Sequence, residues 1–311
     1  MTATAIGSPA PSSNRRRILH VGADKEFAKP SEAAAAVQAG DIVEITSGTY
    51  ADCAVWPRHA RGITIEATGD GVTIADKTCS DKGIFVIQSD DVTVRGITFM
   101  RAKATDHNGA GIRSEARNLT VERARFIDNE NGILAVRSIA DSSIIVRDSY
   151  FKGNGNCIAL CAHGIYVGRI AKLTIERSHF IEQHIGHHVK SRARLTELVG
   201  NVIEDGPYGT ASYLVDIANG GGLIMRDNRL QKGPLSDNPS VAVTLAAEGN
   251  TNASAEIMIE NNTFTNDMAG GTIFVRNGTA TAATLIGNRL MGRVTALQGA
   301  GIVGDQGALP R

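Results

Sequence analysis

A short string of alternating apolar residues recurs along most of the chain, and this repeat is the feature that most constrains the fold. Each copy has apolar side chains at every second position, then a small residue or Asn, then one more apolar residue. Alternation of period two without a helical period predicts strands, and a regular spacing of this kind predicts a solenoid. The eight copies follow one another at intervals of 23 to 34 residues and lie at 92–99, 119–126, 144–151, 173–180, 195–203, 223–230, 257–264 and 283–290.

A second strand lies between successive copies, and it usually begins at Gly. These strands lie at 83–89, 111–116, 132–138, 164–169, 186–191, 213–219, 241–247 and 271–277. Each coil therefore carries two or three short strands, and coils stacked about 4.8 Å apart form parallel sheets. We predict an all-β fold, a right-handed parallel β-helix of about nine to ten coils.

The N-terminal part is predicted to cap the solenoid. Strand-like stretches at 18–21 and 41–50 flank an Ala-rich segment that begins at Pro30 and closes at Gly40. Ser31 is the expected N-cap of this short helix, which would cover the open end of the core. We expect a single domain over 18–303, a disordered tail over 1–17 and a loose tail over 304–311.

Composition limits the partners and leaves the compartment open. The 32 basic and 32 acidic side chains cancel, so no overall field attracts nucleic acid or a membrane surface. No apolar run is long enough for membrane insertion, and no signal peptide is visible behind Arg15, Arg16 and Arg17. The protein is therefore expected in the cytoplasm, or in the periplasm or outside the cell if Met1 replaces a removed signal.

The four cysteines are too few for a disulfide scaffold, although one or two bridges are possible. They are Cys53, Cys79, Cys157 and Cys161. For Cys157 and Cys161 we favour buried thiols over a small loop disulfide, because buried thiols are more common. Four Asn residues fall at equivalent places in successive coils and are expected to form a structural ladder: Asn201, Asn228, Asn262 and Asn288.

Alternation along the Gly-entered strands sorts inward from outward side chains. With Ile165 and Val167 taken as inward, His187 and Val189 also point inward, and His188 and Lys190 point outward. The expected outward column consists of Arg113, Leu134, Tyr166, His188, Asp216 and Thr244, with Lys190 beside His188 on the same strand.

A basic strip crosses this column and predicts a functional site. Between His184 and Arg194 there are six basic or potentially basic residues and no acidic one. The chemistry that fits is β-elimination of an acidic, uronic-acid-containing polysaccharide. This reaction needs a cation for the uronate carboxylate, a base for the C5 proton and an acid for the leaving oxygen.

The predicted catalytic residues are Lys190, His188, Tyr166 and Arg192. Lys190 is the expected base because nearby cations lower its pKa, Arg192 or Arg194 supplies charge, and Tyr166 or His188 is the acid. The reverse assignment, with His188 as base and Lys190 as neutraliser, stays open. The expected substrate-binding residues are Arg194, Asp216, Arg113, Asn219 and His163. No metal ligand set is expected, because His187 and His188 point to opposite faces.

Two other functions stay open from the residues. One is a β-helix without catalytic activity that binds or helps assemble an anionic surface polysaccharide. The other is a glycoside hydrolase, which needs two carboxylates flanking the scissile bond and would use Asp216 or Glu248.

Several motifs carry a resemblance to known proteins. VGADKEF (21–27) and QAGDIVEITSGTY (38–50), with the repeated coils, resemble the right-handed parallel β-helix proteins of the pectate-lyase-like superfamily over residues 18–300. A bacterial group of β-helix proteins is similar at CAHGIYVG (161–168), GHHVKSRA (186–193), ASYLVDIANGG (211–221), DNP (237–239), AAEGN (246–250) and NNTFTND (261–267).

A partial resemblance to the alginate lyase and chondroitinase B type of polysaccharide lyase rests on Lys190-Ser191. The catalytic lysine of that family lies in a Lys-Ser strand end, which implies that Lys190 is the base. The sequence departs from the family where an arginine is expected on the next coil, since Asp216 and Ala218 stand there. Gly186, His187 and His188 replace the acidic calcium ligands before the lysine, so we expect no cofactor.

Overall fold

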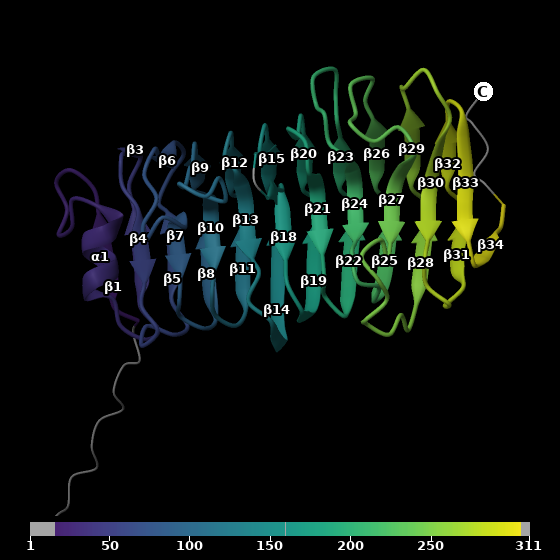
Figure 1. Cartoon of the computed structure of the whole chain (residues 1–311). Coiled ribbons are helices and arrows are strands. Elements are labelled where there is room, and N and C mark those ends of the chain that lie inside the picture. The colour runs from purple at the N-terminus through teal and green to yellow at the C-terminus, as the bar shows by residue number, and fades with distance from the viewer. Residues whose placement is uncertain (1–15, 159, 306–311) are drawn as a thin grey trace, which may run out of the picture.

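The computed structural model describes residues 16–158 and 160–305, and it is a parallel β-helix with one short helix at its N-terminal end (Figure 1). Three long parallel sheets, named A, B and C here, run the length of the solenoid. Of the strands formed by the described residues, sheet A contains 12, slightly more than the nine to ten coils expected, and sheets B and C contain 10 each, which agrees with that number. The predicted all-β solenoid is therefore confirmed.

Most coils contribute one strand to each sheet, so strands three apart in sequence order usually pair. Sheet A contains, in spatial order, β1 (Ile18–Val21), β2 (Ile42–Ile45), β5 (Thr64–Ala67), β8 (Val92–Arg95), β11 (Leu119–Glu122), β14 (Ile139–Arg147), β19 (Ile170–Glu176), β22 (Leu195–Val199), β25 (Gly222–Arg226), β28 (Ile257–Glu260), β31 (Ala283–Ile286) and β34 (Gly301–Val303).

The other two sheets repeat the same order along the axis. Sheet B contains β3 (Gly48–Tyr50), β6 (Val72–Ala75), β9 (Thr98–Met100), β12 (Arg125–Ile127), β15 (Tyr150–Lys152), β20 (His179–Ile181), β23 (Val202–Glu204), β26 (Arg229–Lys232), β29 (Thr263–Asn266) and β32 (Arg289–Met291). Sheet C contains β4 (Ala54–Trp56), β7 (Gly83–Ile87), β10 (Ala110–Ser114), β13 (Asn131–Ala135), β18 (Ile165–Val167), β21 (His187–Ser191), β24 (Tyr213–Ile217), β27 (Val241–Leu245), β30 (Thr272–Asn277) and β33 (Val294–Gly299).

The core is a set of apolar columns that the repeat places inside the coil. Four phenylalanines from sheet B, Phe99, Phe126, Phe151 and Phe180, stack with ring centroids 4.4–5.3 Å apart. Gly132 lies against this stack, and a Cβ there would stand 2.8 Å from Cδ1 of Phe151. The same Cβ would stand 2.4 Å from the backbone carbonyl oxygen of Gly164, so the neighbouring backbone and ring together require Gly at this coil.

The expected Asn ladder is present and fully buried. The side-chain amide of Asn228 donates to Leu198 O (2.8 Å) and to Asn262 Oδ1 (2.9 Å), and its own Oδ1 accepts the Asn201 backbone N–H (2.9 Å). The other three Asn residues likewise donate to a backbone carbonyl and accept a backbone N–H of the preceding coil.

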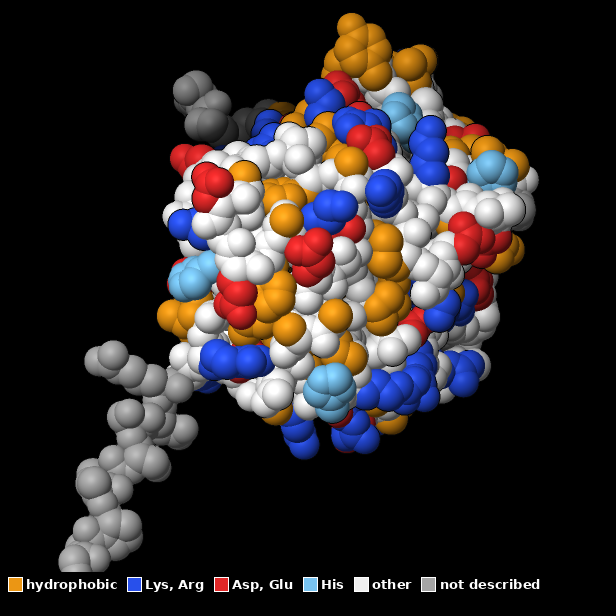
Figure 2. All heavy atoms as spheres, turned by 90° about the vertical axis from the view of Figure 1, so that its left-hand side faces the viewer, with side chains coloured by type: hydrophobic (Ala, Val, Ile, Leu, Met, Phe, Trp, Pro, Cys, Tyr) orange, Lys and Arg blue, Asp and Glu red, His pale blue; other side chains and the backbone are white. Residues whose placement is uncertain are grey.

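The N-terminal helix caps the core as expected, but its boundaries differ from the prediction. Helix α1 (Pro30–Ala36) ends four residues before Gly40, and its N-cap is Lys29 instead of Ser31. The Ser31 backbone N–H donates to Asp52 and the Ala28 N–H donates to Glu32, so carboxylates replace the expected hydroxyl cap. Figure 2 views this end and shows apolar, acidic and basic side chains intermixed on it.

The described residues at the inner ends of the two expected tails form contacts with the solenoid. Arg17 pairs with Asp41 and also donates to Ala36 O, so it belongs to the capped end. Gly304 donates to Leu285 O, and Asp305 O accepts from Gly287, so both continue the last coil. The remaining parts of both expected tails, 1–15 and 306–311, lie outside the described residues.

Both cysteine pairs form disulfides, Cys53–Cys79 and Cys157–Cys161. The preference for free thiols at Cys157 and Cys161 was therefore wrong. The two residues face each other across a small antiparallel hairpin of β16 (Asn156–Cys157) and β17 (Cys161–Ala162), which places their side chains side by side. Among the described residues no helix is both long and apolar enough to span a membrane.

We predict that Asn228→Ala lowers the free energy of unfolding by about 3 kcal/mol, because it removes the side-chain acceptor of the buried Asn201 N–H and the hydrogen bonds to the Leu198 carbonyl and to Asn262. Urea unfolding followed by circular dichroism measures the change. The exposed Asn250 provides a matched control, and Asn250→Ala is expected to change stability by less than about 0.5 kcal/mol. Equal effects of the two substitutions would contradict a structural role for the ladder.

Candidate functional site

The outward face of sheet C carries the predicted site, with one change in its membership. The strand register aligns Arg113, Leu134, Tyr166, Lys190, Asp216 and Thr244 in one column. Lys190 therefore occupies the place that strict alternation assigned to His188. The prediction that His188 points outward was wrong.

His188 lies inside the solenoid because two consecutive residues point inward where the chain enters this strand. Its side chain is 1% exposed, its ring packs edge-on against Phe180, and Nε2 lies 3.0 Å from Asp205 Oδ1. The next residue, Val189, also faces the core. This break in alternation turns His187 outward, where strict alternation had placed it inside.

Lys190 and Arg192 hold a single carboxylate between them. The Lys190 Nζ donates to Glu248 Oε1, and Arg192 Nη2 donates to Glu248 Oε2 at 2.5 Å. We call Lys190 and Arg192 the carboxylate fork. Glu248 lies in the turn after β27, two coils beyond the fork, and its side chain is 42% exposed. A fork in which two cations bind the two oxygens of one carboxylate is a strong and directional anion site.

Asp216 lies beneath this fork and is buried. Its side chain is 2% exposed, and Oδ2 lies 3.4 Å from Lys190 Nζ and 3.5 Å from His187 Nε2. Burial raises the pKa of Asp216 to about 6, although the nearby Lys190 charge opposes this rise. For Glu248, burial favours the neutral form, but the hydrogen bonds from Lys190 and Arg192 outweigh it and lower the pKa below its ordinary value.

Tyr166 and Asn219 complete the surroundings of Arg192. The Tyr166 hydroxyl accepts a 2.9 Å hydrogen bond from Arg192 Nε, and its ring lies beneath both cations at 5.6 Å. Asn219 Oδ1 accepts from Arg192 Nη1, and its amide donates to the Glu248 backbone carbonyl at 3.2 Å. Because Tyr166 accepts from Arg192, its own proton is free to be donated elsewhere.

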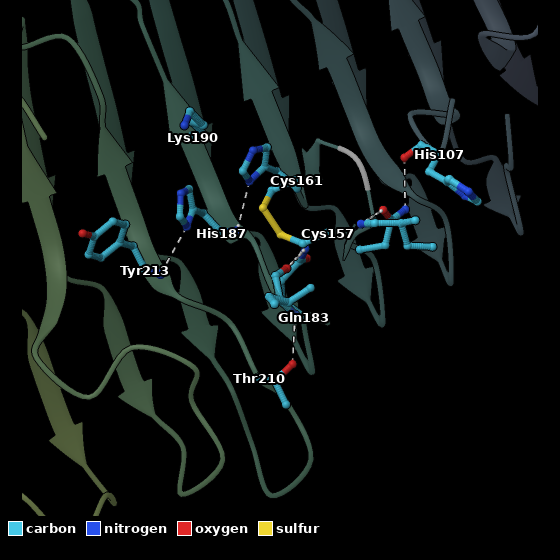
Figure 3. Close-up of a disulfide and its surroundings, with 12 residues drawn as sticks. His107, Cys157, Cys161, Gln183, His187, Lys190, Thr210 and Tyr213 are labelled. Atoms are coloured by element: carbon cyan, nitrogen blue, oxygen red, sulfur yellow. Dashed lines mark hydrogen bonds between the residues drawn. A yellow bond between two sulfur atoms is a disulfide. The ribbon is translucent and has the colours of Figure 1, made fainter. Parts of the chain in front are cut away.

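Three rings form a ladder where the sheet C strands begin. His163 stacks on His187 with centroids 4.8 Å apart, and His187 contacts Tyr213 at 5.0 Å. Figure 3 shows His187 between Tyr213 and the Cys157–Cys161 disulfide, with Lys190 farther along the same strand.

Backbone N–H groups fix the tautomers of both histidines in this ladder. The His187 N–H donates to His163 Nδ1 at 3.0 Å, and the Tyr213 N–H donates to His187 Nδ1 at 3.2 Å. Both rings are therefore neutral, with the proton on Nε2. Burial and the Lys190 charge lower the pKa of His187 to about 3, and burial lowers that of His163 well below its ordinary value.

Two of the predicted substrate-binding residues lie apart from this cluster. Arg113 stands two coils before Tyr166, with Leu134 between them, and its Nε lies 3.9 Å from Glu115. Arg194 is exposed in the turn after β21. Asp216, Asn219 and His163 do lie with the predicted catalytic residues Lys190, Tyr166 and Arg192.

The sequence missed three members of the cluster. Glu248 was considered only for hydrolysis, because nothing in the AAEGN turn indicates that its side chain reaches back over two coils. His187 was assigned to the core through the alternation rule. Tyr213 is the first residue of the apolar strand β24, and only its alignment with His187 across the stack identifies it.

Solved structures with the same fold include carbohydrate-active enzymes. Pectate lyase Pel9A has a TM-score of 0.55 and 13% identity over 90% of this chain and 78% of that chain. Escherichia coli YbhC has a TM-score of 0.52 and 12% identity over 75% and 76%. The pectin methylesterase PemA from Erwinia chrysanthemi has a TM-score of 0.47 and 10% identity over 90% and 93%. At these identities the likeness to Pel9A and YbhC concerns the fold. No curated protein matches the sequence.

A family comparison covers more than half of the chain. Residues 38–211 match the family described as periplasmic copper-binding protein (NosD). The chain belongs to the NosD family. The matched segment contains β2 to β23 and includes Tyr166, Lys190 and Arg192, while Asp216 and Glu248 lie in the coils beyond it.

The described residues of this NosD-family chain do not fit a copper centre. They contain no group of three or more His, Cys, Asp or Glu side chains placed to share a metal ion. All four cysteines are bridged, so no thiolate is available, and the Nδ1 atoms of His163 and His187 already accept backbone N–H groups.

We predict that Asp216→Asn changes how stability depends on pH. In the native protein the pKa of Asp216 is about 6, above its ordinary value of 3.8, so the folded state binds the proton more tightly. Stability from this group is thus present at low pH and lost as pH rises from about 4 to 6. The difference in unfolding free energy, variant minus native, should rise by about 3 kcal/mol over this interval.

Taking this difference removes the opposite contribution of His187, which is common to both proteins. Urea unfolding at half-unit steps between pH 4 and 7 measures it. A difference independent of pH would show that Asp216 is ionised throughout this range.

Proposed function

We propose that this protein acts on an acidic polysaccharide and cleaves it by β-elimination next to a uronate. The carboxylate fork of Lys190 and Arg192 is the observation that carries the proposal. Glu248 places its two carboxylate oxygens on the two cations, and a uronate carboxylate offers the same pair of oxygens. In this proposal the substrate carboxylate replaces that of Glu248, whose exposed side chain is attached to a turn.

Neutralising the carboxylate makes the adjacent C5 proton easier to remove, because charge moves onto the carboxylate as the proton leaves. Tyr166 is the group best placed to transfer protons beside the fork. In this step the Tyr166 oxygen, to which Arg192 donates, takes the C5 proton while its own proton passes to the leaving oxygen, so the C4–O bond breaks as the C4=C5 double bond forms. The hydrogen bond from Arg192 stabilises the charge that forms on that oxygen during the transfer. Lys190 is assigned to the fork, since two carboxylates contact its ammonium group.

A second function, glycoside hydrolysis, is favoured by one observation. Asp216 and Glu248 both contact Lys190 Nζ, and their environments move their pKa values in opposite directions. Two neighbouring carboxyl groups whose pKa values differ in this way can act, one as the acid and the other as the base or nucleophile. The burial of Asp216 makes this function the weaker candidate, because a general acid must reach the glycosidic oxygen.

We also propose a periplasmic location. Two disulfides are typical of oxidising compartments, and the NosD family is described as periplasmic. The copper binding in the family description is not part of the proposal, since the described residues lack a ligand set for it.

The β-elimination proposal predicts different losses for the fork and for Tyr166. Lys190→Met and Arg192→Met should each weaken binding of uronic-acid polymers at least tenfold, because each removes one charge-assisted hydrogen bond. Tyr166→Phe should keep binding within about threefold and lower the cleavage rate at least 100-fold. Calorimetry measures binding, and the ultraviolet absorbance of unsaturated ends measures cleavage.

Arg194→Met is the matched control, since it removes an exposed cation two residues from Arg192. It should leave binding and cleavage within about twofold. Reducing ends are measured in parallel. Reducing ends without unsaturated product would replace elimination by hydrolysis, and binding without either product would establish a binding protein.

We further expect cleavage to proceed without calcium. The described residues that surround the fork contribute two carboxylates, Asp216 and Glu248, and Lys190 contacts both. Dialysis against a chelator should therefore change the cleavage rate by less than about twofold, and added calcium should not raise it. A rate that is lost with the chelator and restored by calcium would contradict this expectation.

A further inference from the structure

Two buried polar atoms lie next to each other on sheet C without a hydrogen-bond partner among the described residues. They are Oδ1 of Asp216 and Oγ1 of Thr244. The two residues pair directly across β24 and β27, in the outward column that also contains Lys190. Both residues are 1% exposed. A buried polar atom without a partner is costly, so two adjacent ones indicate a partner that the protein chain does not supply.

The two atoms have complementary hydrogen-bonding capacity. A carboxylate oxygen accepts a hydrogen bond, and a threonine hydroxyl can donate one. Together they match a hydroxyl group, which donates to Asp216 and accepts from Thr244. A methylated or acetylated oxygen has no proton to donate to Asp216.

The position of the pair relates it to the carboxylate fork. Successive coils are about 4.8 Å apart, so the midpoint between Asp216 and Thr244 lies about 7 Å along the axis from Lys190. Glu248 follows Thr244 by four residues, and its side chain contacts Lys190, the neighbour of Asp216. The contacts of Glu248 with Lys190 and Arg192 hold the turn after β27 over the outward column. Displacing the Glu248 carboxylate from the fork therefore removes these contacts.

We propose that Asp216 and Thr244 bind a free ring hydroxyl of the sugar next to the one whose carboxylate occupies the fork. The pair then determines specificity, because it selects polyuronates with unsubstituted hydroxyls against O-acetylated ones. This inference rests on the proposed binding of a uronate by Lys190 and Arg192, and it adds a second contact that the cleavage proposal does not require.

The test compares binding of polymannuronate and polygalacturonate before and after chemical O-acetylation. The native protein should bind the free form of its preferred polymer at least tenfold more tightly than the acetylated form. Thr244→Val keeps the side-chain shape and removes the hydroxyl. It should weaken binding of the free polymer about tenfold, leave the acetylated polymer unchanged, and bring the ratio close to one.

Two variants separate recognition from structure. Thr244→Ser retains the hydroxyl and should restore the preference. Thr272→Val is the matched control, because Thr272 Oγ1 on sheet C is likewise buried and has no hydrogen-bond partner in the described part of the chain, but it lies outside the column. It should leave both affinities unchanged. Thermal melting confirms folding, and neither valine variant should be destabilised, since no hydrogen bond within the protein is lost.

The outcomes distinguish this inference from the proposed function. Equal binding of free and acetylated polymers that still depends on Lys190 would overturn the hydroxyl site and leave the fork in place; water would then be the partner of both atoms. An equal loss for both polymers in Thr244→Val would also overturn it. Absence of Lys190-dependent binding to any of these polymers would overturn both proposals.

Discussion

The register between stacked coils is the constraint on which the rest of this structure depends. Backbone hydrogen bonds join each strand to the equivalent strand of the next coil, so residues far apart in sequence are brought into columns about 4.8 Å apart. Tyr166, Lys190 and Asp216 become neighbours only through this pairing. The same register stacks the phenylalanines inside and the Asn ladder at the turn. A shift of one residue in one coil would therefore disrupt the core and the candidate site together.

The sequence predicted the features that repeat and failed where the repeat is broken. Apolar alternation identified the coils, and the Asn ladder followed from equivalent positions in four of them. His188 was misplaced because two consecutive residues face inward at the start of its strand, and a period of two cannot show such a break. Its partner Asp205 lies in a turn, and the repeat of apolar residues does not predict where the side chains of a turn lie. Ser31 was misassigned because carboxylates from Asp52 and Glu32 replaced the hydroxyl cap.

Two separate networks of charged residues meet at strand β21, one on each face. In the core, Asp205 accepts from His188 and from the Gly233 N–H, close to the buried Lys232, whose pKa burial lowers to about 8. Outside, Lys190, Arg192, Asp216 and Glu248 form the cluster on sheet C. Strand β21 carries both His188 and Lys190, so one strand is held from within by the first network and presents the second on its surface. The inner network thus fixes the backbone on which the carboxylate fork depends.

The fork also depends on a segment that does not follow the coil. The turn after β27 reaches back over two coils, where Asn252 donates to the Arg192 backbone carbonyl at 3.1 Å and Glu248 contacts both cations. Stacked strands alone would leave Lys190 with the Asp216 carboxylate and Arg192 with no carboxylate among the described residues. A carboxylate from a distant turn compensates both charges without filling the strand positions beneath. Only charge-assisted contacts hold the Glu248 carboxylate, and its side chain is partly exposed. A carboxylate on a polymer can therefore displace it and bind the same two cations. The carboxylate of Asp216 is buried and cannot be displaced in this way.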